Sequence, residues 1–169
     1  VMMRLSGEEK KGRTFQLYAN TLSRKHMYST YLLNGVLSSL LFMAVGVLGM
    51  YVAAMSVMDE PFSFYTVAVS GFAFYPAVLV FLGVGALIQG ISPTKTWILW
   101  IYLTFGFILL YFGNMLDFKE WMLKLSPYEY MPRLPMEESE PLTAILAILL
   151  ALLLCVTGYF LYRNRDLQG

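Results

Sequence analysis

The chain has 169 residues, of which 58% are hydrophobic and only 14% are charged. A soluble domain usually carries about 25% charged residues, so this composition excludes an ordinary soluble fold and predicts an all-α integral membrane protein. Twelve Lys and Arg residues against eleven Asp and Glu residues give a net charge of +1, and we expect no nucleic-acid partner. The lone cysteine, Cys155, excludes a disulfide or a CxxC metal site within the chain.

Residues 1–30 form a polar segment ahead of the first apolar stretch. Ser6 followed by Glu9 is the pattern of a capped helix N-terminus, and a helix from there to about Tyr18 has one apolar and one charged side. We expect a cytoplasmic amphipathic helix. Two interpretations remain open: the helix lies on anionic lipid, or it docks a cytoplasmic partner.

Four stretches without a fixed charge follow, and each predicts one membrane-spanning helix. A helix of about 20 residues crosses the ~30 Å hydrocarbon layer. We place the transmembrane domain at 31–169, with spans at about 31–57, 68–94, 96–116 and 141–162. Pro76 lies inside the second span and lacks a backbone donor, so we predict a kink or break there.

Small residues recur four positions apart within the predicted spans, at Gly35/Ser39, Gly49/Ala53 and Ala86/Gly90. Such pairs let helix backbones approach closely in lipid, although a chain rich in Gly and Ala also contains them by chance. Aromatic residues near the predicted span ends, among them Trp97, Trp100, Tyr159 and Tyr162, are typical of the belt at the water–lipid boundary.

The connection at 117–140 is long for a membrane protein loop. Loops of this length are commonly functional or disordered. We expect a short interfacial helix followed by an extended segment that includes Ser126, Pro127, Tyr128 and Pro132. This outer-loop element dips into the outer leaflet or covers the extracellular mouth of a pathway; the alternative is a solvated connector.

Basic residues are distributed unequally between the two sides of the predicted membrane. Nine lie on the side of the termini and three lie on the other side, whereas acidic residues show the opposite distribution. The positive-inside rule therefore places both termini in the cytoplasm of a multi-pass plasma-membrane protein, and four crossings agree with this.

The sequence contains no recognisable set of catalytic residues. His26 is the only histidine, and the chain has no GxxxxGK[ST] phosphate loop, so we expect no enzyme, cofactor or metal site. The predicted spans carry no acidic or basic residue, which argues against an ion-coupled pump. Two classes remain: a transport pathway driven by another subunit, and a structural or regulatory membrane protein.

Five short segments, in order along the chain, resemble the permease subunits of type-2 ABC exporters, and most closely the bacterial tetronasin-type antibiotic exporters. They are Glu8-Glu9-Lys10-Lys11-Gly12-Arg13, Leu22-Ser23-Arg24-Lys25, Tyr75-Pro76-Ala77, Leu125-Ser126-Pro127-Tyr128 with Met131-Pro132, and Tyr162-Arg163-Asn164-Arg165-Asp166-Leu167. The acidic cluster Glu137, Glu138 and Glu140 departs from the family pattern.

The resemblance implies a C-terminal portion of such a permease, with the last four spans of a six-span unit and an outer loop that re-enters the membrane. It implies two copies of a separate ABC ATPase, a second permease unit, and a hydrophobic or amphipathic substrate. It also implies that the ATPase docks on Glu8, Glu9, Lys11, Gly12 and Arg13. The alternative is an accessory or immunity-type membrane protein without transport activity.

Overall fold

The computed structural model describes residues 24–92, 95, 97–113, 115–116, 118–132 and 141–164, and all regular elements in these ranges are helices. The helices are α3 (Arg24–Val57), α4 (Phe64–Phe72), α5 (Tyr75–Ile91), α6 (Trp97–Phe112), α7 (Glu120–Leu123), the 3-10 helix η2 (Pro127–Tyr130) and α8 (Pro141–Asn164). The all-helical prediction is therefore confirmed for this part of the chain. The amphipathic helix predicted from about Ser6 to Tyr18 lies outside the described residues.

Three helical stretches are long and apolar enough to cross a membrane: Lys25–Val57, Phe64–Ile91 and Pro141–Asn164. They confirm the prediction of a membrane protein. The helix α6 is also apolar, but its 16 residues extend only about 24 Å, which is less than the ~30 Å hydrocarbon layer. The expected number of four full crossings therefore stays a prediction.

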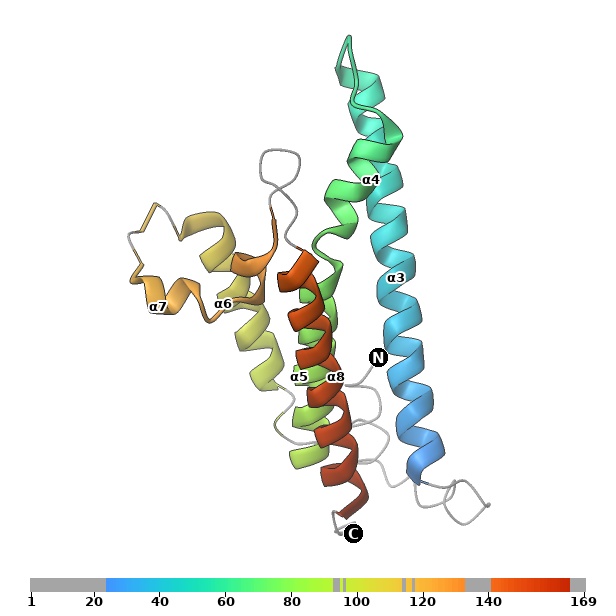
Figure 1. Ribbon diagram of the computed structural model, residues 1–169, viewed down its shortest axis with the longest axis vertical. Coiled ribbons are helices and arrows are strands. Elements are labelled where there is room, and N and C mark those ends of the chain that lie inside the picture. The colour runs from blue at the N-terminus through green and yellow to red at the C-terminus, as the bar shows by residue number, and fades with distance from the viewer. Residues whose placement is uncertain are drawn as a thin grey trace.

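The second apolar stretch is two helices. The helix α4 ends at Phe72 and α5 begins at Tyr75, with Pro76 in the first turn of α5. The first N–H groups of a helix have no partner within it, so a proline there loses no hydrogen bond. After the turn at the upper end of α3, α4 runs back along that helix (Figure 1), and the rings of Tyr51 and Phe64 meet edge to face at 5.3 Å.

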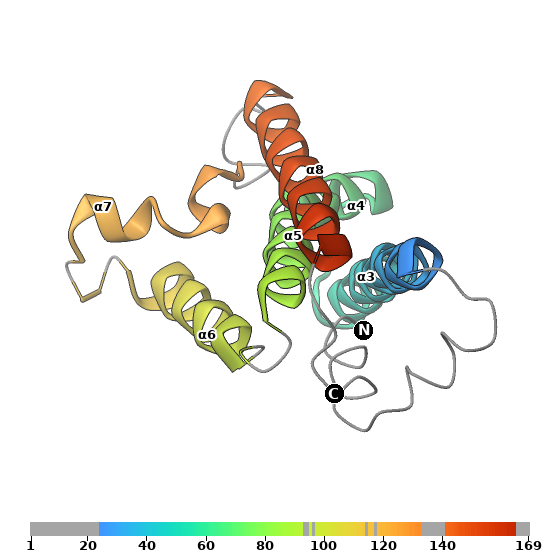
Figure 2. The ribbon, with the colours of Figure 1, turned by 90° about the horizontal axis from the view of Figure 1, so that it is seen from below.

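Close packing joins α5 to α8, which lie side by side in both ribbon views (Figures 1 and 2). A Cβ added to Gly83 would lie 3.0 Å from the Ala151 carbonyl oxygen, and one added to Gly90 would collide with the backbone of Gly158. Ala86, between the two glycines, is fully buried. Small side chains thus let the two backbones touch, which is how helices associate where lipid removes the hydrophobic driving force.

Tyr28 attaches the first turns of α3 to this helix pair. Its hydroxyl donates a hydrogen bond to the Cys155 carbonyl oxygen at 3.0 Å, and its ring packs on Tyr159 and Tyr162 at 5.7 and 5.4 Å between centroids. Tyr162 is therefore only 2% exposed. Tyr162 thus packs inside the protein at the end of α8, and its expected place at the depth of the water–lipid boundary stays a prediction.

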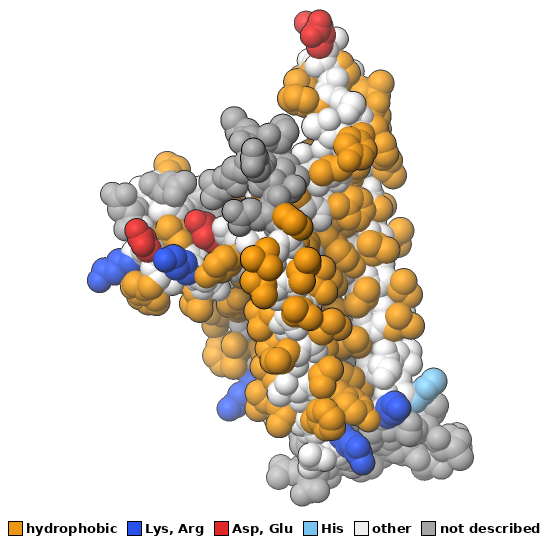
Figure 3. Space-filling model, viewed as in Figure 1, with side chains coloured by type: hydrophobic (Ala, Val, Ile, Leu, Met, Phe, Trp, Pro, Cys, Tyr) orange, Lys and Arg blue, Asp and Glu red, His pale blue; other side chains and the backbone are white. Residues whose placement is uncertain are grey.

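The tryptophans at the start of α6 are much more exposed than Tyr162 at the end of α8. Trp97 and Trp100, at the start of α6, are 58% and 62% exposed, as residues of an interfacial belt are. They lie near Lys95, which precedes α6 in the chain. The lower end of the molecule in Figure 3 carries basic side chains, and the tip of the α3–α4 connection carries acidic ones.

Candidate functional site

The segment from α7 to η2 folds back from the end of α6 toward α5 and α8 (Figures 1 and 2). Ser126 shapes its turn, because the Ser126 hydroxyl oxygen accepts a hydrogen bond from the Tyr128 N–H at 3.3 Å and caps η2. Pro127 occupies the first turn of η2, where no donor is needed. Ser126 and Met131 are 2% and 3% exposed, so this segment is packed into the protein.

Aromatic rings hold the segment against the long helices. Phe81 of α5 contacts both Tyr102 of α6, at 5.0 Å between ring centroids, and Tyr128 of η2, at 5.2 Å. Gly106 of α6 makes room for this cluster: a Cβ there would lie 3.2 Å from Phe81 and 3.6 Å from the Ser126 hydroxyl oxygen. We call Phe81, Tyr102, Gly106, Ser126 and Tyr128 the aromatic junction.

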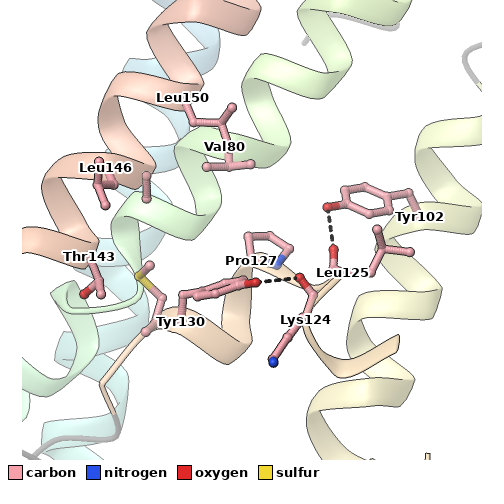
Figure 4. A pocket seen from close by; sticks show the side chains of 11 residues that line it. Val80, Tyr102, Lys124, Leu125, Pro127, Tyr130, Thr143, Leu146 and Leu150 are labelled. Atoms are coloured by element: carbon pink, nitrogen blue, oxygen red, sulfur yellow. Dashed lines mark hydrogen bonds between the residues drawn. The ribbon is translucent and has the colours of Figure 1, made fainter. Parts of the chain in front are cut away.

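Two hydrogen bonds to the backbone fix the preceding residues (Figure 4). The Tyr102 hydroxyl donates to the Leu125 carbonyl oxygen at 3.2 Å, and the Tyr130 hydroxyl donates to the Lys124 carbonyl oxygen at 3.1 Å. Burial raises the pKa of the Tyr128 phenol above its ordinary value, so this hydroxyl stays protonated at neutral pH. The segment is thus tied to α6 by both polar and apolar contacts.

A cavity of about 390 Å³ lies between this segment, α5 and α8 (Figure 4). Its walls are largely apolar, with Leu146, Leu150 and Val80 on the helix side and Pro127 and Tyr130 on the segment side. This volume is within the range of ~300–1,000 Å³ that is typical of small-molecule sites.

Among the described residues that line this first cavity, Lys124 alone carries a charge. The Lys124 ammonium lies 4.0 Å from the Glu120 carboxylate, and both side chains are mostly exposed. Thr143 of α8 adds a hydroxyl to the lining. The cavity therefore offers an apolar body with a few polar groups, the pattern expected for an amphipathic ligand.

A second cavity, of about 370 Å³, lies between α3, α5 and α6. Phe81 and Tyr128 line it, whereas their chain neighbours Val80 and Pro127 line the first cavity. Gly35 and Ser39 form part of its α3 wall. The aromatic junction therefore stands between two apolar cavities, and a movement of η2 would change the shape of both.

The structure brings together three of the predicted outer-loop residues. Ser126, Pro127 and Tyr128 lie at the junction, and Pro132 follows the buried Met131 and is half-buried. The predicted docking residues Glu8, Glu9, Lys11, Gly12 and Arg13 lie outside the described residues. The residues of the described part contain no group of three His, Cys, Asp or Glu side chains that could hold a metal ion.

Sequence reasoning missed Phe81, Tyr102 and Gly106. The two aromatic residues stand in apolar runs of a chain with 12 Phe and 12 Tyr residues, so nothing in the pattern distinguishes them. Gly106 left a weak signal, since it is the one glycine of α6 and is flanked by two phenylalanines. Such a glycine indicates a close approach by another group.

Comparisons with known proteins agree with the resemblance at the level of the family. The family described as "Multidrug efflux system permease Rv1217c, C-terminal domain" matches residues 1–163. The multidrug efflux system permease protein Rv1217c of Mycobacterium tuberculosis (strain ATCC 25618 / H37Rv) is 30% identical over 170 residues. This alignment covers 98% of the chain and 30% of that relative, so the chain spans under a third of the relative's length.

Proposed function

We propose that this chain, which belongs to the C-terminal domain family of multidrug efflux permeases, forms part of the membrane pathway of an exporter driven by a separate ABC ATPase. The match of residues 1–163 to a permease domain carries the proposal. The chain itself is not an enzyme in this scheme, because ATP hydrolysis takes place in the partner. The narrower assignment to tetronasin-type antibiotic exporters rests on the short motifs alone.

The two cavities support a hydrophobic or amphipathic substrate. Both have mainly apolar linings, and the aromatic junction separates them. In the proposed pathway the outer-loop element Ser126, Pro127, Tyr128 and Pro132 covers the outer mouth, and displacement of η2 connects the pathway to the outside. The fold of η2 toward α5 and α6 supports this role.

The distribution of charge supports one orientation of the chain in the membrane. The first turn of α3, the α5–α6 connection and the last turn of α8 carry Lys25, Lys95 and Arg163, and the α3–α4 connection at the opposite end carries Asp59 and Glu60. This distribution supports cytoplasmic termini in the plasma membrane. We propose that the chain supplies the last four spans of a six-span unit and works with a second permease unit.

The ATPase dimer docks, in this proposal, on the segment that contains Glu8, Glu9, Lys11, Gly12 and Arg13. The motif resemblance supports this assignment. Alanine at Glu8, Glu9 and Arg13 together should abolish co-purification of the ATPase from the intact protein and abolish efflux. Reversal of two exposed charges on the other side, Asp59→Lys and Glu60→Lys, is the matched control and should keep co-purification. Retention of both ATPase and efflux by the alanine variant would contradict docking at this segment.

The pathway is tested by dye efflux from cells that express the intact permease and its ATPase. Tyr128→Ala removes the η2 ring from the aromatic junction, and we expect dye efflux to fall, since the second cavity loses part of its wall and Phe81 loses the ring that packs against it. Tyr65→Ala is the control, because Tyr65 is 77% exposed on α4. An accessory protein without transport activity predicts that dye accumulation is the same for the wild type, both variants and a deletion of the permease.

A further inference from the structure

A third cavity of about 540 Å³ lies apart from the aromatic junction, between the first turns of α3 and the last turns of α8. Residues of α3 line one wall and residues of α8 line the other. The described residues that line it are Lys25, Tyr28, Ser29, Leu32, Leu33, Val36, Leu152, Cys155, Val156 and Tyr159. We call this cavity the α3–α8 groove. We propose that it is a binding site for one anionic phospholipid.

The length of the groove matches one membrane leaflet. Its α3 wall runs from Lys25 to Val36, which at about 1.5 Å per residue is about 16 Å, or half of the ~30 Å hydrocarbon layer. Its α8 wall runs from Tyr159 at the same end to Leu152 at the deep end. A fatty acyl chain that lies along the α3 wall therefore has about the length of one leaflet available between the levels of Lys25 and Val36.

The polar groups of the groove are gathered at one end. Lys25 and Ser29 are four residues apart, so they lie one above the other on the same face of α3, and both side chains are exposed. The Tyr28 hydroxyl is already engaged with Cys155. Lys25 and Ser29 together offer an ammonium and a hydroxyl to the phosphate of a lipid headgroup. Basic pockets between membrane helices are known to recognise such headgroups.

The deeper walls of the groove are suited to an acyl chain and poorly suited to another helix. Leu33, Leu152 and Val156 are 59%, 56% and 52% exposed and present branched, bulky side chains. Helices that pack in lipid prefer small residues at the contact, as α5 and α8 show at Gly90 and Gly158. A packed helix would also need a groove that runs through the whole hydrocarbon layer, whereas the α3–α8 groove is only about half as long.

The headgroup is tested by native mass spectrometry of the intact protein. The probes are phosphatidylglycerol and phosphatidylcholine with identical acyl chains. We expect the wild type to prefer phosphatidylglycerol. Lys25→Ala should weaken the binding of phosphatidylglycerol about fivefold, because the attraction of one Lys to an anionic lipid surface changes the dissociation constant by about this factor. Lys95→Ala is the matched control, since Lys95 is exposed at the same end of the molecule but outside the groove.

The acyl-chain wall is tested by a bulky substitution. Val156→Trp fills the groove and should weaken the binding of both lipids, whereas Leu153→Trp should not, because Leu153 is 63% exposed on α8 and does not line the groove. Gel filtration confirms that each variant is folded. Equal lipid binding by wild type, Lys25→Ala and Val156→Trp would overturn the proposal and indicate that another segment of the intact protein covers the groove. If Lys95→Ala weakened phosphatidylglycerol binding as much as Lys25→Ala does, the lipid would be held by non-specific charge attraction and the proposed site would be ruled out.

The lipid site rests on the membrane location of the chain and not on export. Lys25 and Val156 do not belong to the aromatic junction or line either of its cavities. Loss of dye efflux in Tyr128→Ala, together with equal lipid binding by the wild type, Lys25→Ala and Val156→Trp, supports the pathway alone. Unchanged efflux in Tyr128→Ala, together with weakened lipid binding by Lys25→Ala and Val156→Trp, supports the lipid site alone. The two proposals therefore fail separately.

Discussion

Substitution of Gly158 by alanine is expected to force α5 and α8 apart. The added Cβ would lie 2.6 Å from the Ala86 carbonyl oxygen, 2.8 Å from the Ala86 carbonyl carbon and 2.7 Å from the Tyr28 hydroxyl oxygen. Comfortable contacts of carbon with other heavy atoms begin at about 3.5 Å, so the overlap is near 1 Å. Two of the three atoms are helix backbone, which cannot rotate away as a side chain can.

The expected loss of stability follows from three contributions. Overpacking of a close contact costs about 1–3 kcal/mol. Displacement of Tyr28 weakens its hydrogen bond to Cys155, and such bonds contribute about 0.6 kcal/mol in membrane proteins. Alanine in place of glycine gains about 0.5–1 kcal/mol from the helix backbone. The free energy of unfolding should therefore fall by about 1–3 kcal/mol.

The assay is reversible unfolding of the purified intact protein in mixed micelles with increasing SDS, followed by circular dichroism. Gly49→Ala is the control, because no atom lies within 4 Å of a Cβ placed there. It should leave the free energy of unfolding unchanged or raise it by up to about 1 kcal/mol. The reasoning about close packing is refuted if Gly158→Ala is as stable as Gly49→Ala.

Three further substitutions test the contacts that hold the helices and the outer segment. Tyr28→Phe keeps the ring but removes the hydrogen bond to Cys155, and should lower the free energy of unfolding by about 0.5–1.5 kcal/mol in the same SDS assay; no change would mean that the ring alone holds α3. Ser126→Ala removes the cap of η2 and should cost about 1 kcal/mol, measured as a lower midpoint of thermal unfolding, and replacement by threonine should restore part of it. Gly106→Val places branched carbon against Phe81 and should reduce dye efflux while the protein still reaches the membrane; full efflux at normal expression would show that the aromatic junction is not needed for transport.

The identity of the packed residues shows where sequence reasoning fails. The pairs Ala86/Gly90 and Gly49/Ala53 have the same spacing, yet Gly90 touches the backbone of Gly158 while Gly49 faces open space. Lipid chains and neighbouring helices are equally apolar, so hydropathy does not distinguish a lipid-facing position from a packed one. The same reason explains why the burial of Tyr162 under Tyr28 was not apparent from its place in the sequence.

Properties that depend on local chemistry could be predicted from the amino-acid sequence. Apolar stretches without charge require helices in lipid, because each backbone group must find its partner inside the segment. The interruption between Phe72 and Tyr75 lies next to Pro76, whose missing donor is also a local property. The unequal distribution of basic and acidic residues between the two sides of the membrane could likewise be predicted from the order of residues along the chain.

Contacts between residues that are distant along the chain became known from the three-dimensional arrangement of the helices. The aromatic junction joins Phe81, Tyr102 and Tyr128 from three elements, and the α3–α8 groove joins residues more than 100 positions apart. Such contacts depend on the relative placement of helices. That placement is set by the fit of small and large side chains across each interface, a property of pairs of surfaces that no single stretch of sequence contains.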